Sequence, residues 1–222
     1  MLKQFPGFLS GLMIMTSLTL SSGCENQGSE YGAGHDFGDN NSDVVLVMGD
    51  SITAGGFSGS APWPSRFGAA SGKTVINDGI AGATSGLGSA RIGGMLAATK
   101  PGFVIIGFGA NDAILSMSAD TTANHIRAMV AAAKNNRTIP VVATVMPMQG
   151  GRSIYNGHVD AINERIRTIA SEYNVRVINL HGAVGSNPDE YYVDGLHLND
   201  AGENLVALEY TDLFNAGNPR IM

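Results

Sequence analysis

The sequence has one cysteine and few charged side chains, and these scarcities exclude several classes of protein. A disulfide framework needs paired cysteines, so Cys24 alone cannot supply one. Acidic residues outnumber basic residues by 19 to 13, and the basic residues form no stripe along the sequence. Such a chain is poorly suited to bind a polyanion, and we expect no nucleic acid among its partners.

A long apolar run is missing at the amino terminus as well. The segment Phe8–Leu20 is too short, and too interrupted by Gly, Ser and Thr, to span a bilayer comfortably. With Lys3 before it and small residues after it, the segment is typical of a signal peptide over residues 1–23. We therefore expect an extracytoplasmic protein, in the periplasm or at the cell surface.

The residue that follows the signal peptide, Cys24, resembles the lipidation site of bacterial lipoproteins. The match is imperfect, because Leu20 lies four positions before the cysteine rather than three. We expect a lipid anchor at Cys24, with secretion after ordinary cleavage, or an uncleaved anchor, as the alternatives. That anchor is the one membrane contact we expect.

Two regions follow the signal peptide. Residues 24–42 are rich in Gly, Asn, Ser and acidic residues, which predicts a flexible tether. Residues 43–222 are long enough to bury a sizeable core and are expected to form one domain. Removal of residues 1–23 takes away one lysine and no acid, so the exported chain carries a net charge of −7.

Five apolar segments in the domain predict strands that are buried on both faces. They lie at residues 44–48, 74–77, 103–108, 139–145 and 175–180. Helical segments are expected at residues 65–70, 85–99, 120–134, 156–173 and 200–215. This alternation favours an α/β fold with a parallel sheet, in which functional groups lie beyond the carboxyl ends of the strands.

Four polar stretches carry the candidate chemistry, three of them at predicted strand ends and the last before the closing helix. They are Gly49-Asp50-Ser51, Asn77-Asp78-Gly79-Ile80-Ala81-Gly82, Gly109-Ala110-Asn111-Asp112 and Asp194-Gly195-Leu196-His197. Each alone has an ordinary explanation as a helix cap, a turn or a surface loop. Each also suits catalysis, since Ser51 would be displayed on a tight turn, Asn111 is an uncharged donor, and Asp194 can orient His197 toward a serine.

In this order, the four stretches resemble those of the SGNH branch of the GDSL esterases and lipases, over residues 43–215. The resemblance implies a three-layer α/β/α, flavodoxin-like domain, in agreement with the five expected strands of a parallel sheet. It implies Ser51 as nucleophile and Asp194 with His197 as the acid–base pair. It further implies an oxyanion hole of the Ser51 and Gly82 amides and the Asn111 side chain.

The resemblance implies a serine hydrolase that needs no cofactor, and the sequence has no cluster of metal ligands at the usual spacing. A phosphate loop is not supported either, because the similar segment Gly68–Thr74 is one residue short and precedes a strand. We expect hydrolysis of short-chain carboxylic esters through an acyl-enzyme on Ser51. The expected substrate is a small ester or an acetylated carbohydrate. The alternatives are a lysophospholipase or thioesterase of the same family and, in another class, a non-catalytic binding lipoprotein.

Several residues near the predicted site remain open to two interpretations. Phe57 and Trp63 could form one wall of an acyl pocket or pack on the domain edge. Met146 and Met148 could line the acyl site, although core packing is the more common role of methionine. His181, at a strand end, is the rival base to His197 but has no carboxylate nearby in the sequence.

Overall fold

The computed structural model describes Met1 and residues 32–185 and 190–216, so the predicted signal peptide and Cys24 lie outside the described residues. The strands are β1 Asn41–Gly49, β2 Thr74–Gly79, β3 Pro101–Gly107, β4 Ile139–Ala143 and β5 Arg176–Ile178. The helices are α1 Ser51–Ala54, α2 Trp63–Ser71, α3 Ser85–Thr99, α4 Ala110–Ile114, α5 Ala119–Asn135, the 3₁₀ helix η1 Gly150–Tyr155, α6 Asn156–Tyr173, α7 Leu180–Val184 and α8 Asp200–Ala216. No helix in these ranges is long and apolar enough to cross a membrane.

The five strands form one parallel sheet in the order β2-β1-β3-β4-β5, which is the flavodoxin-like order. The chain leaves β1 toward β2 on one side and later returns to place β3 on the other. The carboxyl ends of β1 and β3 therefore flank a point where the winding reverses, and loops that diverge there leave room for a site. The expected five-stranded parallel sheet and its fold class are confirmed.

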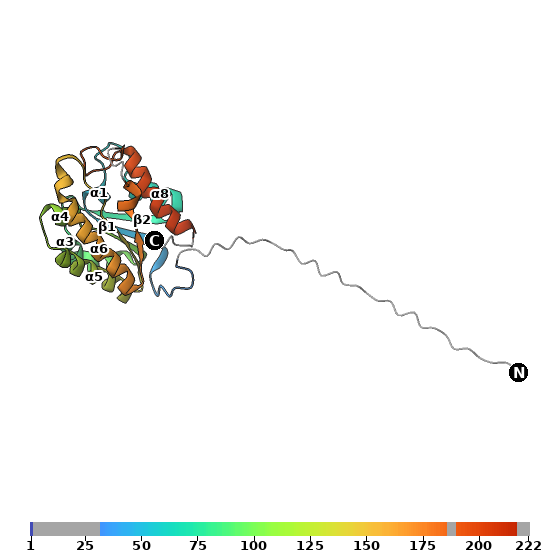
Figure 1. Cartoon of the computed structure of the whole chain (residues 1–222). Helices are drawn as coiled ribbons and strands as arrows, with labels where there is room; N and C mark the ends of the chain where they lie inside the picture. Colours follow the sequence, from blue (N-terminus) through green and yellow to red (C-terminus); the bar gives the residue numbers. More distant parts are fainter. Residues whose placement is uncertain (2–31, 186–189, 217–222) are drawn as a thin grey trace.

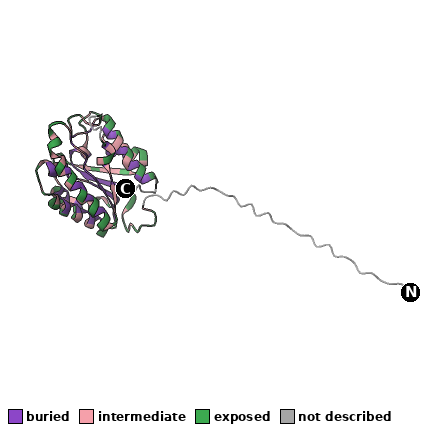
Figure 2. Ribbon diagram, in the orientation of Figure 1, coloured by how far each residue is buried: buried purple, intermediate pink, exposed green. Residues whose placement is uncertain are grey.

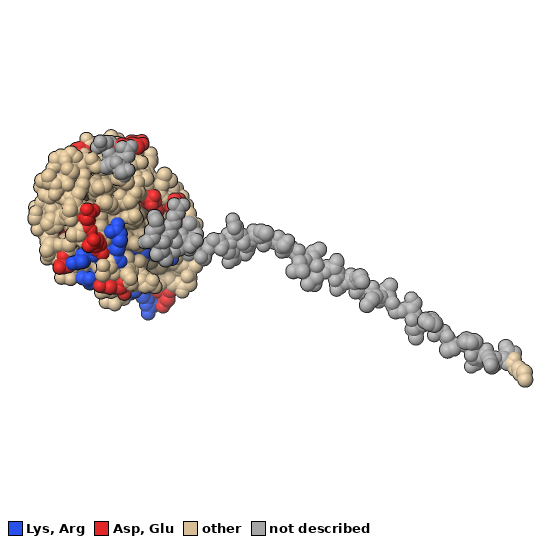
Figure 3. Space-filling view, viewed as in Figure 1, with Lys and Arg blue, Asp and Glu red and all other residues tan. Residues whose placement is uncertain are grey.

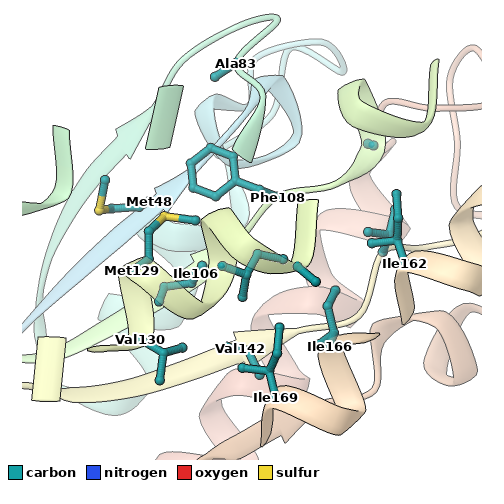
Figure 4. Packing of buried hydrophobic residues seen from close by; sticks show 14 of the residues in the cluster. Met48, Ala83, Ile106, Phe108, Met129, Val130, Val142, Ile162, Ile166 and Ile169 are labelled. Atoms are coloured by element: carbon teal, nitrogen blue, oxygen red, sulfur yellow. The ribbon is translucent and has the colours of Figure 1, made fainter. Parts of the chain in front are cut away.

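Side-chain alternation along the strands builds two cores. In β1, Leu46 and Met48 face one side of the sheet, while Val45 and Val47 face the other. The first side packs against α3, α5 and α6, and Figure 4 shows Met48 and Ile106 beside helix residues such as Met129. The second side packs against α2, α7 and α8, which gives three layers (Figure 1). Figure 2 shows buried residues in the sheet and exposed ones on the outer helix faces, although the edge strand β2 has no fully buried residue.

The expected strands and helices are all present, with differences at their ends. The segment at 175–180 differs most, because β5 ends at Ile178 and Leu180 begins α7. Leu180 lies on this helix and its side chain is buried in the core. An apolar residue at this position is compatible with a buried strand or a buried helix, so the sequence could not distinguish the two. The short helices α4 and α7 and the 3₁₀ helix η1 were not expected.

The residues before β1 lie at the amino edge of the sheet, opposite the site described below. The Phe37 ring packs 5.5 Å from that of Phe103, near the start of β3. The Asn40 side chain donates to the backbone carbonyl of Asn136, and Asn41 already belongs to β1. The described part of the segment expected as a tether thus contacts the domain well before β1, since the His35 Nε2 also lies 3.1 Å from the Arg137 carbonyl.

Candidate active site

The turn after β1 places Ser51 at the carboxyl edge of the sheet. Asp50 caps α1 by accepting a hydrogen bond from the Ile52 N–H at 2.9 Å, and Ser51 is the first residue of this helix. A Cβ at Gly49 would lie 2.0 Å from Thr53 Oγ1, so only glycine permits the turn to pack this tightly. Ser51 is 7% exposed, and its own N–H lies among the first amides of α1, which have no acceptor within the helix.

Ser51, His197 and Asp194 form a continuous chain of hydrogen bonds. Ser51 Oγ lies 3.0 Å from His197 Nε2, and His197 Nδ1 lies 2.9 Å from Asp194 Oδ2. The remaining carboxylate oxygen, Oδ1, accepts from the N–H groups of Leu196 (3.0 Å) and His197 (2.8 Å). With the proton of the imidazole on Nδ1, the unprotonated Nε2 faces the serine hydroxyl, as a general base requires.

The loop around Asp194 keeps its carboxyl ionised. Burial raises the pKa of Asp194, but the hydrogen bonds from the His197 N–H, the His197 ring and the Leu196 N–H outweigh burial and lower the pKa to about 2. Arg152, from η1, adds a positive charge, since its Nη1 donates to the Asp194 carbonyl at 2.6 Å and lies 3.5 Å from Oδ2. A permanently charged Asp194 stabilises the imidazolium that forms when His197 takes a proton.

Asn111 connects the two turns that would supply the oxyanion donors. Its Nδ2 donates to the Ala83 carbonyl at 3.0 Å and lies 3.5 Å from Asp50 Oδ2. The amide group has two hydrogens, and the longer contact, toward Asp50, leaves the second one available to an oxyanion. Gly82, with φ of +75°, is exposed, and its N–H has no acceptor within the described ranges, so it is also free to donate.

Replacing Asn111 by alanine should lower kcat for an ester by about 10²- to 10³-fold and leave KM nearly unchanged, because the lost donor binds the transition state and not the ground state. Steady-state kinetics on p-nitrophenyl acetate measure both constants. The control is Asn124→Ala, since Asn124 is exposed on α5 and contacts Arg127. A rise in KM at constant kcat would show that Asn111 binds substrate rather than the oxyanion.

Asp112, which follows Asn111, is fully buried and braces the loop. Its Oδ2 accepts from the Ser85 N–H at 3.0 Å, and its Oδ1 accepts from the hydroxyls of Ser85 and Thr122. The Ser85 hydroxyl also lies 3.0 Å from His125 Nδ1, so His125 belongs to this bracing network. These contacts fix the start of α3 against α4, and with it the turn that carries Gly82.

Asp50 has a raised pKa, and this predicts a pH-dependent stability. Burial raises the pKa of Asp50 to about 7, although the Ile52 N–H lowers it, and the nearby Asp112 raises it further. The native state therefore holds a proton that the unfolded chain loses near pH 4. The stabilisation is complete below that pH and is lost as the pH rises to 7.

The Asp50→Asn variant cannot release this proton. From pH 5 to pH 8 the wild type should lose about 2 to 3 kcal/mol of unfolding free energy that the variant does not lose. Urea unfolding of both proteins at the two pH values measures the difference. Parallel pH dependences of the two proteins would mean that Asp50 is ionised in the native state throughout.

The structure also decides the open interpretations of neighbouring residues. The Phe57 ring stacks on the His197 ring, whereas Trp63 is buried against Tyr210 on α8. Met146 and Met148 are both buried in the core, as methionines usually are. The rival base His181 lies 3.3 Å from Asp160, a carboxylate that sequence distance had concealed, and is not part of the Ser51 hydrogen-bond chain.

Two neighbours of the site were not assigned from the sequence. Phe57 was considered as a wall of an acyl pocket or as a residue packed on the domain edge, and its contact with His197 was not foreseen, because nothing in the sequence indicates which ring it contacts. Arg152 belongs to no motif, and its contact with Asp194 joins residues 42 positions apart. A basic residue in the loop after the fourth strand was the one available signal, and it is too common to be informative.

Charged side chains of both signs are interspersed on the surface. On the face shown in Figure 3, basic side chains lie beside acidic ones and do not gather into a continuous patch. Among the described residues, no group of His, Cys, Asp or Glu is placed to hold a metal ion. The chemistry that the arrangement offers is nucleophilic attack by Ser51, with His197 moving the proton and the amides receiving the oxyanion.

Comparisons with known proteins agree with this arrangement. The sequence profile of the GDSL-like Lipase/Acylhydrolase family matches residues 47–205. The Escherichia coli (strain K12) protein "Thioesterase 1/protease 1/lysophospholipase L1" is 29% identical over 170 residues, which are 74% of this chain and 80% of that protein.

Solved structures share the fold. The lipase/acylhydrolase from Enterococcus faecalis is 25% identical with a TM-score of 0.67, and the match covers 81% of this chain and 99% of that one. The psychrotrophic esterase EstA from Pseudoalteromonas sp. is 22% identical with a TM-score of 0.64, and the match covers 77% and 95%. The second likeness supports the fold alone.

Proposed function

Because the chain belongs to the GDSL-like lipase/acylhydrolase family, and is thus a hydrolase of the esterase and lipase type, we propose that it cleaves short-chain carboxylic esters. Acetyl esters of carbohydrates are the substrate class we favour. The observation that carries the proposal is the pair of hydrogen-bond contacts that join Ser51 Oγ to His197 (3.0 Å) and His197 to Asp194 (2.9 Å). A binding protein of the same fold would have no need of an aligned nucleophile and base.

In the proposed reaction, Ser51 attacks the ester carbonyl while His197 takes the hydroxyl proton. The amides of Ser51 and Gly82 and the Asn111 side chain hold the negative oxygen, and His197 then gives its proton to the leaving alkoxide. Water repeats these steps on the acyl-enzyme and releases the acid.

The surroundings of Ser51 favour a small acyl group. Glycines occupy positions 49, 55, 56 and 82, so few side chains extend from the turns near the nucleophile. A cavity of about 40 Å³ lies behind the turn, lined by Asp50, Trp63 and Tyr210 among others but not by Ser51. Because Ser51 does not line this cavity, it provides no buried tunnel for an acyl chain at the nucleophile.

We further propose that the protein is exported and held at the membrane by Cys24. The described chain enters the domain at the amino edge of the sheet, whereas Ser51 lies beyond the carboxyl end of β1, about 30 Å away for a strand of this length. An anchor attached to the amino edge would direct the active site away from its own membrane. That orientation favours esters outside the membrane, such as acetylated polysaccharides. Incorporation of labelled palmitate that is lost in Cys24→Ala tests the anchor.

A second candidate function is thioester or lysophospholipid hydrolysis, which the name of the Escherichia coli relative supports. Exposed apolar side chains in loops at the same edge also favour it, since Phe57, Ile80 and Leu115 could contact a longer acyl chain. The proposed orientation counts against lipids of the anchoring membrane as substrates.

The test is hydrolysis of p-nitrophenyl esters from acetate to palmitate by the chain without residues 1–23. Highest activity on acetate or butyrate supports the short-chain proposal, and acetylated xylan and chitin oligomers then test the carbohydrate class. Highest activity on octanoate or longer esters supports the second candidate, with palmitoyl-CoA and lysophosphatidylcholine as further substrates. A folded protein that cleaves none of these esters would overturn the enzyme proposal and favour a binding lipoprotein.

A further inference from the structure

The Phe57 side chain lies flat on the imidazole of His197. The ring centroids are 3.6 Å apart and the planes differ by 11°, which is a parallel stack. His197 uses its two ring nitrogens for Ser51 and Asp194, and both nitrogens lie at the edge of the ring. The Phe57 ring covers the face of the imidazole and therefore competes with neither hydrogen bond.

Folding stability does not account for this contact. Phe57 is 47% exposed and belongs to neither core cluster, whereas Trp63, six positions later, is 3% exposed and stacks on Tyr210. Its one aromatic neighbour among the described residues is His197. A large apolar side chain left half in solvent, against a single functional ring, indicates a role at the site rather than in the core.

The loop that carries Phe57 is built to present it. Gly55 and Gly56 precede Phe57 with φ of +71° and +93°, a region that disfavours residues with a Cβ. After Phe57 the loop is fastened to α2, because the Arg66 Nε donates to the Ala61 carbonyl at 2.7 Å. The glycines let the backbone turn toward His197, and the fastening limits how far the loop moves away.

We propose that Phe57 is a positioning residue for His197. The stack holds the imidazole plane so that Nε2 stays directed at Ser51 while Nδ1 stays on Asp194, and it excludes water from one ring face. When His197 takes the serine proton, the electron-rich face of Phe57 lies against the imidazolium and stabilises it. Both effects act on the transition state more than on substrate binding, so their loss affects kcat.

The inference rests on the proposed ester hydrolysis, and its test compares Phe57→Ala, Phe57→Leu, Phe57→Tyr and Phe57→Trp. Phe57→Ala should lower kcat by about tenfold, from the loss of ring stacking and of imidazolium stabilisation. Leucine should restore little of this, and tyrosine and tryptophan should restore most of it. The matched control is Leu208→Ala, because Leu208 is also a large apolar side chain, is 59% exposed on α8 and takes no part in the hydrogen bonds that join Ser51, His197 and Asp194.

Two readouts separate positioning from a role as a wall of the acyl pocket. Loss of a positioning residue lowers kcat by the same factor for acetate, butyrate and octanoate esters, and it slows inactivation of Ser51 by diisopropyl fluorophosphate by that factor. A change confined to KM, or one that varies with acyl length, would overturn the inference and assign Phe57 to substrate binding. So would full activity of Phe57→Ala or full rescue by leucine. Failure of the wild type on every ester would instead contradict the proposed function.

Discussion

Replacing His197 by alanine is expected to lower kcat on p-nitrophenyl acetate by about 10⁶-fold, and Ser51→Ala should lower it by a similar factor. Each change removes one end of the 3.0 Å contact between Oγ and Nε2, through which the nucleophile loses its proton. Without His197 the serine hydroxyl stays protonated and is a weak nucleophile, and without Ser51 no acyl-enzyme forms. Rates of the purified variants, with circular dichroism to verify folding, measure the effect.

The double variant Ser51→Ala with His197→Ala should be no slower than either single variant, because the two side chains act as a unit. The matched control is His181→Ala. This histidine also lies at the carboxyl edge and also pairs with a carboxylate, that of Asp160, so its removal should leave kcat unchanged. If His181→Ala lost activity while His197→Ala stayed active, His181 would be the general base and our assignment of His197 would be wrong.

The features that could be predicted from the sequence are those fixed by local pattern. Buried strands such as β1 and β3 are continuous apolar runs, and helices such as α5 and α6 show a clear apolar face, so their positions followed from periodicity. The order of the motifs predicted which residues form the site, because the turns after parallel strands meet at one edge of the sheet. Ser51 and His197 are 146 positions apart, and only that topology brings them together.

Contacts between side chains from different elements could not be predicted. Phe57 and Trp63 are large aromatic residues of one loop region and have similar preferences for burial. Trp63 is the first residue of α2 and reaches the core, whereas Phe57 lies on a glycine turn and reaches His197. The difference is set by backbone direction in a loop, for which the sequence has no periodic signal.

The pairing of Asp160 with His181 was concealed for a similar reason. Asp160 lies on α6 and His181 on α7, and their contact depends on how these two helices pack around β5. Among the described residues, a carboxylate therefore lies beside a histidine in two pairs at this side of the molecule. Only in the pair of Asp194 and His197 does the histidine also contact a serine. This geometric difference cannot be predicted from residue types, and it favours His197 as the base.

The last prediction uses this second pair as its control. Asp194→Asn should lower kcat by about 10³- to 10⁴-fold, while Asp160→Asn should leave it unchanged. An amide at position 194 can present its NH₂ group to Nδ1, which favours the tautomer with the proton on Nε2, and it no longer stabilises the imidazolium. Arg152 also binds the backbone carbonyl of residue 194, so the loop retains one of its supports in the variant.

The pH profile provides an independent check on the same carboxyl group. With a pKa of about 2, Asp194 is ionised from about pH 4 upward, so its titration cannot cause a loss of wild-type activity between pH 4 and pH 7. The Asp194→Asn variant should therefore stay slow across this whole range rather than match the wild type at its acidic end. Convergence of the two rates near pH 5 would mean that Asp194 is protonated there, and that its hydrogen bonds do not hold the charge as the geometry requires.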